Sequence, residues 1–365
     1  MGHFFKIIFV LIVAILLFSI FYKKYYMFHN TTVAKWEKHK ILLPGYDVKH
    51  IRFINYKTGF LFCTYKSRDL SLNPDIMEHK RQQEAIIFKT IDGGINWTIV
   101  YKDKGELIPI CVNSELGFVT KIEYVGENAS PKSLLLKSTD SGATWLEIGE
   151  LPILAFNGGD YKPNSLVLWG SQQLKQCSYK AIFSIDYGKT WQDIEFSNPP
   201  DSLPKPVLNQ NGRMWYFSGN SLVMKDLHTQ TEHIEKIFNN IKKIVMSIDE
   251  NQNLWFIGSS DNILKLYKRM HDGEILSTLT PITKDSFFPD YLHVFDNSII
   301  IWGKEIVETN LIPKYRMYYS QDKGKTWAEE KIPNSLHANP VAFYGKDSVW
   351  AIGLNGVIQI RKERM

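Results

Sequence analysis

The most apolar stretch of the chain runs from Phe4 to Tyr22 and carries a single charge, on Lys6. Its length matches the roughly 20 residues that a helix needs to cross the hydrocarbon core of a bilayer. Neither a small-residue cleavage site nor a lipobox cysteine follows it. We expect an uncleaved signal anchor and its flank in residues 1–30, followed by one folded unit over residues 31–365. The alternative is a buried N-terminal helix.

Beyond this stretch, short apolar runs alternate with polar, turn-forming residues. The runs are five or six residues long and rich in β-branched and aromatic side chains, as in Gly59–Cys63, Leu166–Gly170 and Ser298–Gly303. Runs of this kind, bounded by turn residues, are typical of strands. Hydrophobic residues make up 44% of the chain and charged residues 22%, which excludes general disorder. The pattern predicts an all-β fold.

Four octapeptides repeat one pattern: Ser or Thr, any residue, Asp, any residue, Gly, any residue, Thr or Asn, and Trp. The Asp can accept hydrogen bonds from backbone N–H groups ahead of it, and the Gly can supply the positive φ of a tight turn. The Trp then begins the returning strand and packs across the base of the hairpin. Each octapeptide offers one carboxylate, too few for a Ca²⁺ loop, so we predict structural turns. The fixed positions are Asp92, Gly94, Trp97, Asp140, Gly142, Trp145, Asp186, Gly188, Trp191, Asp322, Gly324 and Trp327.

The spacing of these turns predicts the architecture. Asp92, Asp140 and Asp186 are 48 and 46 residues apart, the repeat length of a four-stranded propeller blade. The next octapeptide Asp comes 136 residues after Asp186, which leaves room for two degenerate blades with turns at Asp226 and Asp272. Six turns account for six blades.

A seventh blade is predicted from the two ends of the folded unit. The segment Val341–Ile360 supplies three further strands but not a fourth, and Trp36–Leu43 is similar to the segments that follow each octapeptide. Joining the two would remove the open edge of an unclosed array. We favour seven blades, with six as the alternative.

The octapeptide pattern is that of the Asp box, also called the BNR repeat. Over residues 36–361 the chain resembles the Asp-box β-propellers, which include sialidases, sortilin-type receptor domains, and the photosystem II assembly and stability factors. Positive charge on both sides of the apolar stretch, at Lys6 and at Lys23 and Lys24, slightly favours a cytosolic propeller. The resemblance is to a mostly exported family, and on that ground we expect a single-pass protein with a periplasmic or extracytoplasmic propeller.

A sialidase-like site would require an Arg-Ile-Pro segment and a cluster of three arginines. Arg52 lies at about the expected place, but Phe53 and Ile54 follow it and no proline does. Arg213, Arg269 and Arg316 could supply partners, although none lies in a recognisable motif. We therefore predict no catalytic residues and no enzyme. The alternative is a sialidase-like glycosidase or a sugar-binding propeller.

Two polar segments depart from the blade plan and are candidate binding loops, because function tends to lie in long loops on a rigid scaffold. They are Lys66–Glu84 and His271–Asp290, and the second ends near Phe287 and Phe288, which we expect to be exposed. With Arg52, these two aromatic residues are the candidate binding residues. We predict a protein partner in the cell envelope, bound for complex assembly or toxin neutralisation.

Charge and cysteine content exclude other classes. The net charge of +5 is spread along the chain without a basic run, so we expect no nucleic-acid binding. Cys63, Cys111 and Cys177 lie far apart without metal-ligand spacing. We expect buried thiols, with one disulfide as the alternative, and neither a metal nor a cofactor.

Overall fold

The computed structural model describes most of the chain after residue 34. The described residues are 35–40, 45–65, 83–125, 130–153, 155–163, 165–171, 179–197, 205–260, 263–270, 273–280, 282, 286–306, 313–330, 332, 341–346, 348–352 and 357–362. The apolar stretch predicted to span a membrane lies outside these residues. Within them, no helix is long and apolar enough to cross a bilayer.

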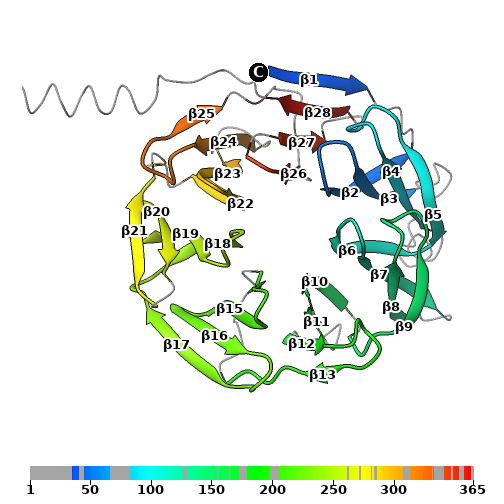
Figure 1. Ribbon diagram of the computed structural model, residues 1–365, viewed down its shortest axis with the longest axis horizontal. Coiled ribbons are helices and arrows are strands. Elements are labelled where there is room, and N and C mark those ends of the chain that lie inside the picture. The colour runs from blue at the N-terminus through cyan, green and yellow to red at the C-terminus, as the bar shows by residue number, and fades with distance from the viewer. Residues whose placement is uncertain are drawn as a thin grey trace, which may run out of the picture.

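The described strands form seven four-stranded antiparallel sheets, which stand side by side around a central axis (Figure 1). We number these sheets as blades 1 to 7. Six blades each consist of four consecutive strands, and the seventh combines strands from both ends of the folded unit. In each blade the first strand lies nearest the axis and the fourth at the rim (Figure 1).

Blades 1 to 3 are each formed by four consecutive strands. Blade 1 contains β2 (Tyr46–Phe53), β3 (Gly59–Tyr65), β4 (Glu84–Thr90) and β5 (Thr98–Lys104). Blade 2 contains β6 (Glu106–Val112), β7 (Gly117–Val125), β8 (Ser130–Ser138) and β9 (Leu146–Glu150). Blade 3 contains β10 (Ala155–Lys162), β11 (Ser165–Ser171), β12 (Tyr179–Ser184) and β13 (Gln192–Asp193).

Blades 4 to 7 follow the same order. Blade 4 contains β14 (Val207–Leu208), β15 (Arg213–Ser218), β16 (Ser221–Asp226) and β17 (Glu232–Ile237). Blade 5 contains β18 (Lys242–Ile248), β19 (Leu254–Ser260), β20 (Ile263–Arg269) and β21 (Ile275–Leu279). Blade 6 contains β22 (Phe287–Phe295), β23 (Ser298–Glu305), β24 (Lys314–Ser320) and β25 (Ala328–Glu330). Blade 7 contains β26 (Val341–Tyr344), β27 (Ser348–Ile352), β28 (Val357–Lys362) and, as its outer strand, β1 (Lys35–Lys40).

The ring closes through the N-terminal strand, as the sequence predicted. β1 pairs antiparallel with β28, and the register places Lys35 opposite Lys362 and Lys40 opposite Val357. The six-bladed alternative would have left β1 unpaired. Closure also hides the edge that β28 would otherwise expose to solvent.

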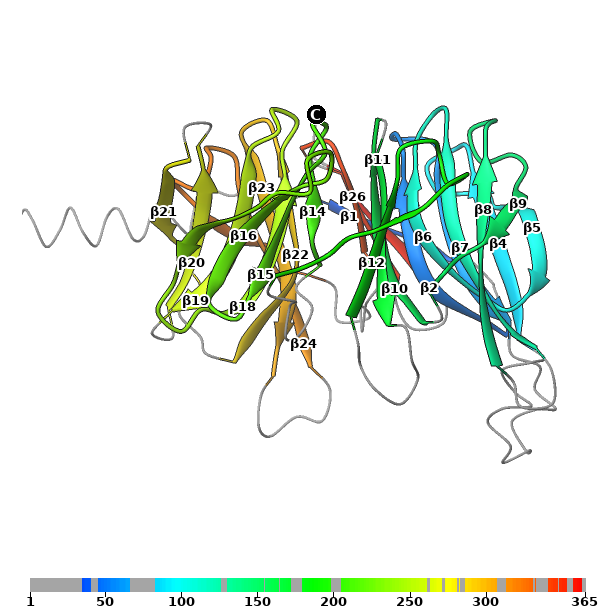
Figure 2. The same cartoon turned by 90° about the horizontal axis from the view of Figure 1, so that it is seen from below.

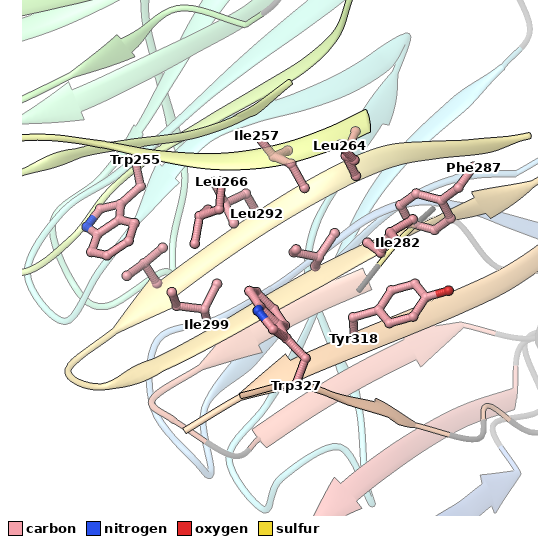
Figure 3. Packing of buried hydrophobic residues seen from close by; sticks show 12 residues of the cluster. Trp255, Ile257, Leu264, Leu266, Ile282, Phe287, Leu292, Ile299, Tyr318 and Trp327 are labelled. Carbon is pink, nitrogen blue, oxygen red and sulfur yellow. The ribbon is translucent and has the colours of Figure 1, made fainter. Parts of the chain in front are cut away.

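The core lies between the blades. Strands β19 and β20 of blade 5 face β22, β23 and β24 of blade 6, and their apolar side chains interdigitate (Figure 3). Trp255 and Trp327 come from different blades and are both buried in this cluster (Figure 3). Because each blade buries its faces only against its neighbours, the short apolar runs of the sequence can form a stable structure only as a ring.

The innermost strands are not regular. The pairing register shifts within β2, β6, β10, β18 and β22, in each case against the second strand of the same blade. Such bulges bend a strand and redirect its side chains. In β2 the shift lies between Val48 and His50, and in β22 it lies between Pro289 and Tyr291. Both shifts adjoin the charged residues described below.

Phe287 and Phe288 correct one expectation from the sequence. His271–Asp290 is not a single long loop, because it contains β21 and the start of β22. Phe287 is buried between blades 5 and 6, and Phe288 is half-buried with the Lys243 ammonium 4.4 Å from its ring centroid. Their apolar character reflects strand packing rather than an exposed binding surface.

The other predicted loop and the cysteines are described only in part. Residues 66–82 of the predicted loop Lys66–Glu84 lie outside the described residues, and Glu84 begins β4. Cys63 is buried, Cys111 is half-buried, and both are free thiols. Cys177 lies outside the described residues.

Candidate functional site

The four octapeptides form turns of one geometry, which we call the box turns. In the turn at Asp140, the Ser138 hydroxyl donates to Asp140 Oδ1 over 2.8 Å and accepts from the Gly142 N–H at 2.8 Å. Asp140 Oδ1 also accepts from the backbone N–H groups of Ala143 and Thr144, both at 2.9 Å. The Thr144 hydroxyl donates to Asp140 Oδ2. Equivalent bonds surround Asp92, Asp186 and Asp322.

These bonds stabilise the ionised carboxylate. The Thr144 hydroxyl and backbone lower the pKa of Asp140, and those of Thr190 do the same for Asp186. At Asp92, burial raises the pKa, but hydrogen bonds from Asn96 and its neighbours outweigh burial and bring the value to about 2. Every carboxylate oxygen is occupied within its own turn, so the box aspartates serve the scaffold.

Each box turn also packs on the preceding blade. A Cβ added to Gly142 would lie 2.5 Å from the Phe60 ring of blade 1, and one added to Gly188 would lie 2.5 Å from Leu135 of blade 2. At blade 1 the Trp350 Nε1–H of blade 7 donates to the Gly93 carbonyl over 3.2 Å. The glycines are therefore needed for close contact between blades as well as for their positive φ.

A group of charged and polar side chains from different blades meets at the axis. We call it the axial cluster, and it comprises His50, Arg52, Asp160, Lys205, Asp290 and Tyr291. The Lys205 ammonium of blade 4 lies 5.8 Å from the Tyr291 ring centroid of blade 6, although blade 5 separates those two blades along the ring. The Lys205 side chain therefore reaches past the inner edge of blade 5.

Arg52 on β2 is the electrostatic centre of this cluster. Its charge lowers the pKa of Lys205, of Asp160 on β10 and of Tyr291 on β22. Burial is the larger cause in each case: it also lowers the pKa of Lys205, but it raises the pKa values of Asp160 and Tyr291, which stay above their usual values despite the Arg52 charge. The candidate binding residue Arg52 therefore lies within electrostatic range of blades 3, 4 and 6.

Neither cation of the cluster has a paired anion within the part of the chain that the structure describes. Arg52 and Lys205 are both solvent-accessible, and no hydrogen bond or ion pair to a described residue holds either side chain. Burial and the Arg52 charge both lower the pKa of Lys205. Asp290 acts in the opposite direction on Lys205, but it makes no ion pair with it, and two cations that repel each other favour the entry of an anion.

The two carboxylates of the cluster differ in their contacts, and Asp290 Oδ2 is buried without a hydrogen-bond partner among the described residues. Asp160 Oδ2 accepts from the Leu208 N–H at 3.1 Å, and its Oδ1 accepts from the Tyr161 N–H at 2.8 Å. Asp290 Oδ1 lies 3.8 Å from the Lys304 ammonium. Burial raises the pKa of both carboxyls, which weakens their ability to neutralise the cations.

His50 completes the cluster as a neutral group. Burial is the main cause that lowers its pKa to about 3, followed by the charges of Arg52, Lys205 and Lys49. The imidazole is therefore uncharged at neutral pH, and it adds hydrogen-bonding capacity without adding charge.

Arg213, Arg269 and Arg316, the possible partners of Arg52 in a sialidase-like site, lie outside the axial cluster. Arg316 pairs with Glu305 and Glu329. Arg269 pairs with Glu235 and stacks on Trp215, and it lines a polar pocket between blades 4 and 5 together with Arg213. Of Arg52, Arg213, Arg269 and Arg316, which the structure describes, no three lie around one carboxylate position. Among the described residues, no group of three or more His, Cys, Asp or Glu side chains is arranged to hold a metal ion.

Similar proteins were found only among solved structures. No protein-family model matches the chain, and no curated protein matches it. A structure of YCF48 bound to a D1 peptide is similar, with a TM-score of 0.57 and 17% identity over 92% of this chain and 97% of that one. The chain has the β-propeller fold.

Two antibiotic lyases share this fold. A streptogramin B lyase has a TM-score of 0.57 and 16% identity over 90% of this chain and 97% of that one. A virginiamycin B lyase from Staphylococcus aureus has a TM-score of 0.56 and 16% identity over 90% of this chain and 98% of that one. At these identities the likeness to a propeller concerns the fold, and function must be argued from the site.

Sequence reasoning placed Arg52 among the candidates but missed the rest of the axial cluster. A signal was present in β2, where the polar residues His50 and Arg52 alternate with the buried Ile51 and Phe53. The partners from other blades could not be inferred, because Lys205 precedes a strand of only two residues, β14. Their meeting depends on the closure of the ring.

Proposed function

We propose that the chain is a non-catalytic Asp-box propeller that binds a protein partner in the cell envelope. The observation that carries this proposal is the convergence of Arg52 and Lys205 at the axis without a paired anion. An acidic side chain or a terminal carboxylate of a partner would compensate both charges. Such charge-assisted hydrogen bonds are stronger than those between neutral groups.

The similar fold of YCF48, whose structure holds a D1 peptide, supports the proposal, because it is an example of a propeller that accepts a peptide. The separation of Arg52 from Arg213, Arg269 and Arg316 argues against the sialidase-like alternative. The lyases among the similar structures leave an enzyme as the competing class. A partner that binds without being chemically changed would decide between the two.

The proposal includes a membrane anchor in residues 4–22 and an extracytoplasmic propeller. The apolar stretch and the resemblance to exported propellers support it. A reporter that is active only outside the cytosol, fused after Met365, should be active. Activity of a cytosol-specific reporter in the same position would contradict this orientation.

The axial site can be tested by removing its two positive charges. We expect Arg52→Gln combined with Lys205→Gln to abolish recovery of the specific partner when the full chain is purified from its native membrane. The matched control is Lys314→Gln combined with Lys325→Gln, which removes the same charge from exposed positions on blade 6. Equal recovery with both double variants would show that the partner does not bind at the axis.

A further inference from the structure

At one end of the ring, exposed apolar side chains lie in or beside the turns of three consecutive blades. We call the end with the box turns the turn face; it lies along the upper edge in Figure 2. On blade 1, Ile91 is 71% and Ile95 is 56% exposed. Leu146 on blade 2 is 68% and Ile185 on blade 3 is 52% exposed. The equivalent positions of blade 6 are Gln321 and Lys325, so the apolar side chains occupy only part of this face.

The chain enters the propeller on this same face. In the other six blades the third and fourth strands are joined at the turn face, as β4 and β5 are by the box turn at Asp92. In blade 7 the corresponding strands are β28 and β1, which are not joined. Because Lys35 pairs with Lys362, the first residue of β1 lies at the end of β28, where other blades have their turn.

The point of entry adjoins the apolar side chains. Blade 7 contacts the first box turn through the bond from Trp350 to the Gly93 carbonyl, and the Trp350 ring also stacks on Phe53 of β2 with the ring centroids 3.7 Å apart. Residues 23–34 separate the apolar stretch from β1. Even fully extended, they span at most about 40 Å. An anchor in the bilayer would therefore hold this part of the turn face near the membrane.

We propose that the turn face of blades 1 to 3 rests on the lipid bilayer and inserts Ile91, Ile95, Leu146 and Ile185 among the headgroups. The inference rests on the proposed anchor but not on the axial site. Three of these side chains lie in the box turns and Leu146 begins the strand that follows one, on three separate blades in all, and Lys57 and Lys189, which are exposed, lie near the first and third of these turns. Apolar residues flanked by lysines suit the boundary between acyl chains and anionic headgroups.

The test measures lipid contact at matched positions of the full chain in nanodiscs that contain anionic lipid. Spin labels are placed at Ile91→Cys and Ile95→Cys, with Gln321→Cys and Lys325→Cys as controls at the same positions of another box turn. Cys177 is replaced by Ser, and Cys63 and Cys111 react slowly because burial raises the pKa of each thiol to about 12. The readout is the ratio of collision rates with lipid-soluble oxygen and with a water-soluble nickel chelate.

The proposal predicts an oxygen-to-nickel ratio several-fold higher at positions 91 and 95 than at positions 321 and 325. Equal, low ratios at all four positions would overturn it. Labels at 91 and 95 that become shielded only when a protein partner is added would also overturn it and assign the surface to that partner. A chain that does not remain with the nanodisc would refute the anchor, while the axial double variant would still test partner binding separately.

Discussion

At the scale of single residues, the axial cluster and the box turns use charge in opposite ways. Each box carboxylate is ionised and satisfied by its own turn, as Asp140 is by Ser138 and Thr144. At the axis, Arg52 and Lys205 make no ion pair with a described carboxylate. His50 is neutral at neutral pH because its pKa is lowered. The box turns therefore contribute to stability, whereas the axis retains unsatisfied charge available for binding.

His50 should make stability depend on pH. Its pKa is about 3 in the folded protein and about 6.5 when unfolded, so the unfolded chain binds an extra proton between these values. The free energy of unfolding should not depend on His50 titration above about pH 6.5. Below that pH it should fall towards pH 3, with a slope of up to about 1.4 kcal/mol per pH unit. Urea unfolding across this range would measure the slope.

The His50→Gln variant provides the comparison, because glutamine keeps a polar side chain but does not titrate. Its free energy of unfolding should fall less steeply than that of the wild type between pH 6.5 and pH 4. Parallel curves for the two proteins would mean that the imidazole is not held neutral at the axis.

At the scale of elements, ion pairs on the outer part of the ring connect neighbouring blades. Lys121 on β7 is buried and lies 2.6 Å from Asp103 on β5 of the preceding blade. Arg269 on β20 makes two bonds to Glu235 on β17 of the preceding blade. Both pairs join a middle strand to the neighbouring outer strand, which is otherwise the most exposed strand of its blade.

Breaking the second pair should be costly. Arg269→Met would leave the Glu235 carboxylate, only 10% exposed, without its partner, and should lower the free energy of unfolding by about 3 kcal/mol. Adding Glu235→Gln should restore much of that loss. The matched control is Arg213→Met, which removes an exposed arginine 3.9 Å from Asp226 and should cost less than about 1 kcal/mol. Equal losses for the two single variants would contradict a specific role for the Arg269 pair.

Sequence patterns predicted the strands and turns better than the contacts that these elements make with other blades. The box turns and the period between them placed the blades, because the turn chemistry is local and repeats. Phe287 was misplaced because an apolar pair after a polar segment occurs both in exposed loops and at the start of a buried strand. The bulges of the inner strands and the ion pairs between blades depend on neighbours far away in sequence, so no local pattern specifies them.

At the scale of the whole molecule, closure of the ring determines both proposed surfaces. It brings Arg52 of blade 1 within electrostatic range of Lys205 of blade 4, and it places the start of β1 on the turn face. The similarity of Trp36–Leu43 to the segments that follow the octapeptides was enough to predict this closure. The meeting of side chains at the axis was not predictable, because it depends on the number and tilt of the blades.

Truncation of the N-terminus tests closure most directly. A chain without residues 1–30 keeps β1 and should unfold in one cooperative transition. A chain without residues 1–44 loses β1, which leaves β28 with an unpaired edge, and it should melt at a clearly lower temperature or aggregate. The measurement is the thermal unfolding transition of both chains, followed by circular dichroism. If the two chains melt at the same temperature with equal cooperativity, β1 does not close the ring, and the account of both surfaces is contradicted.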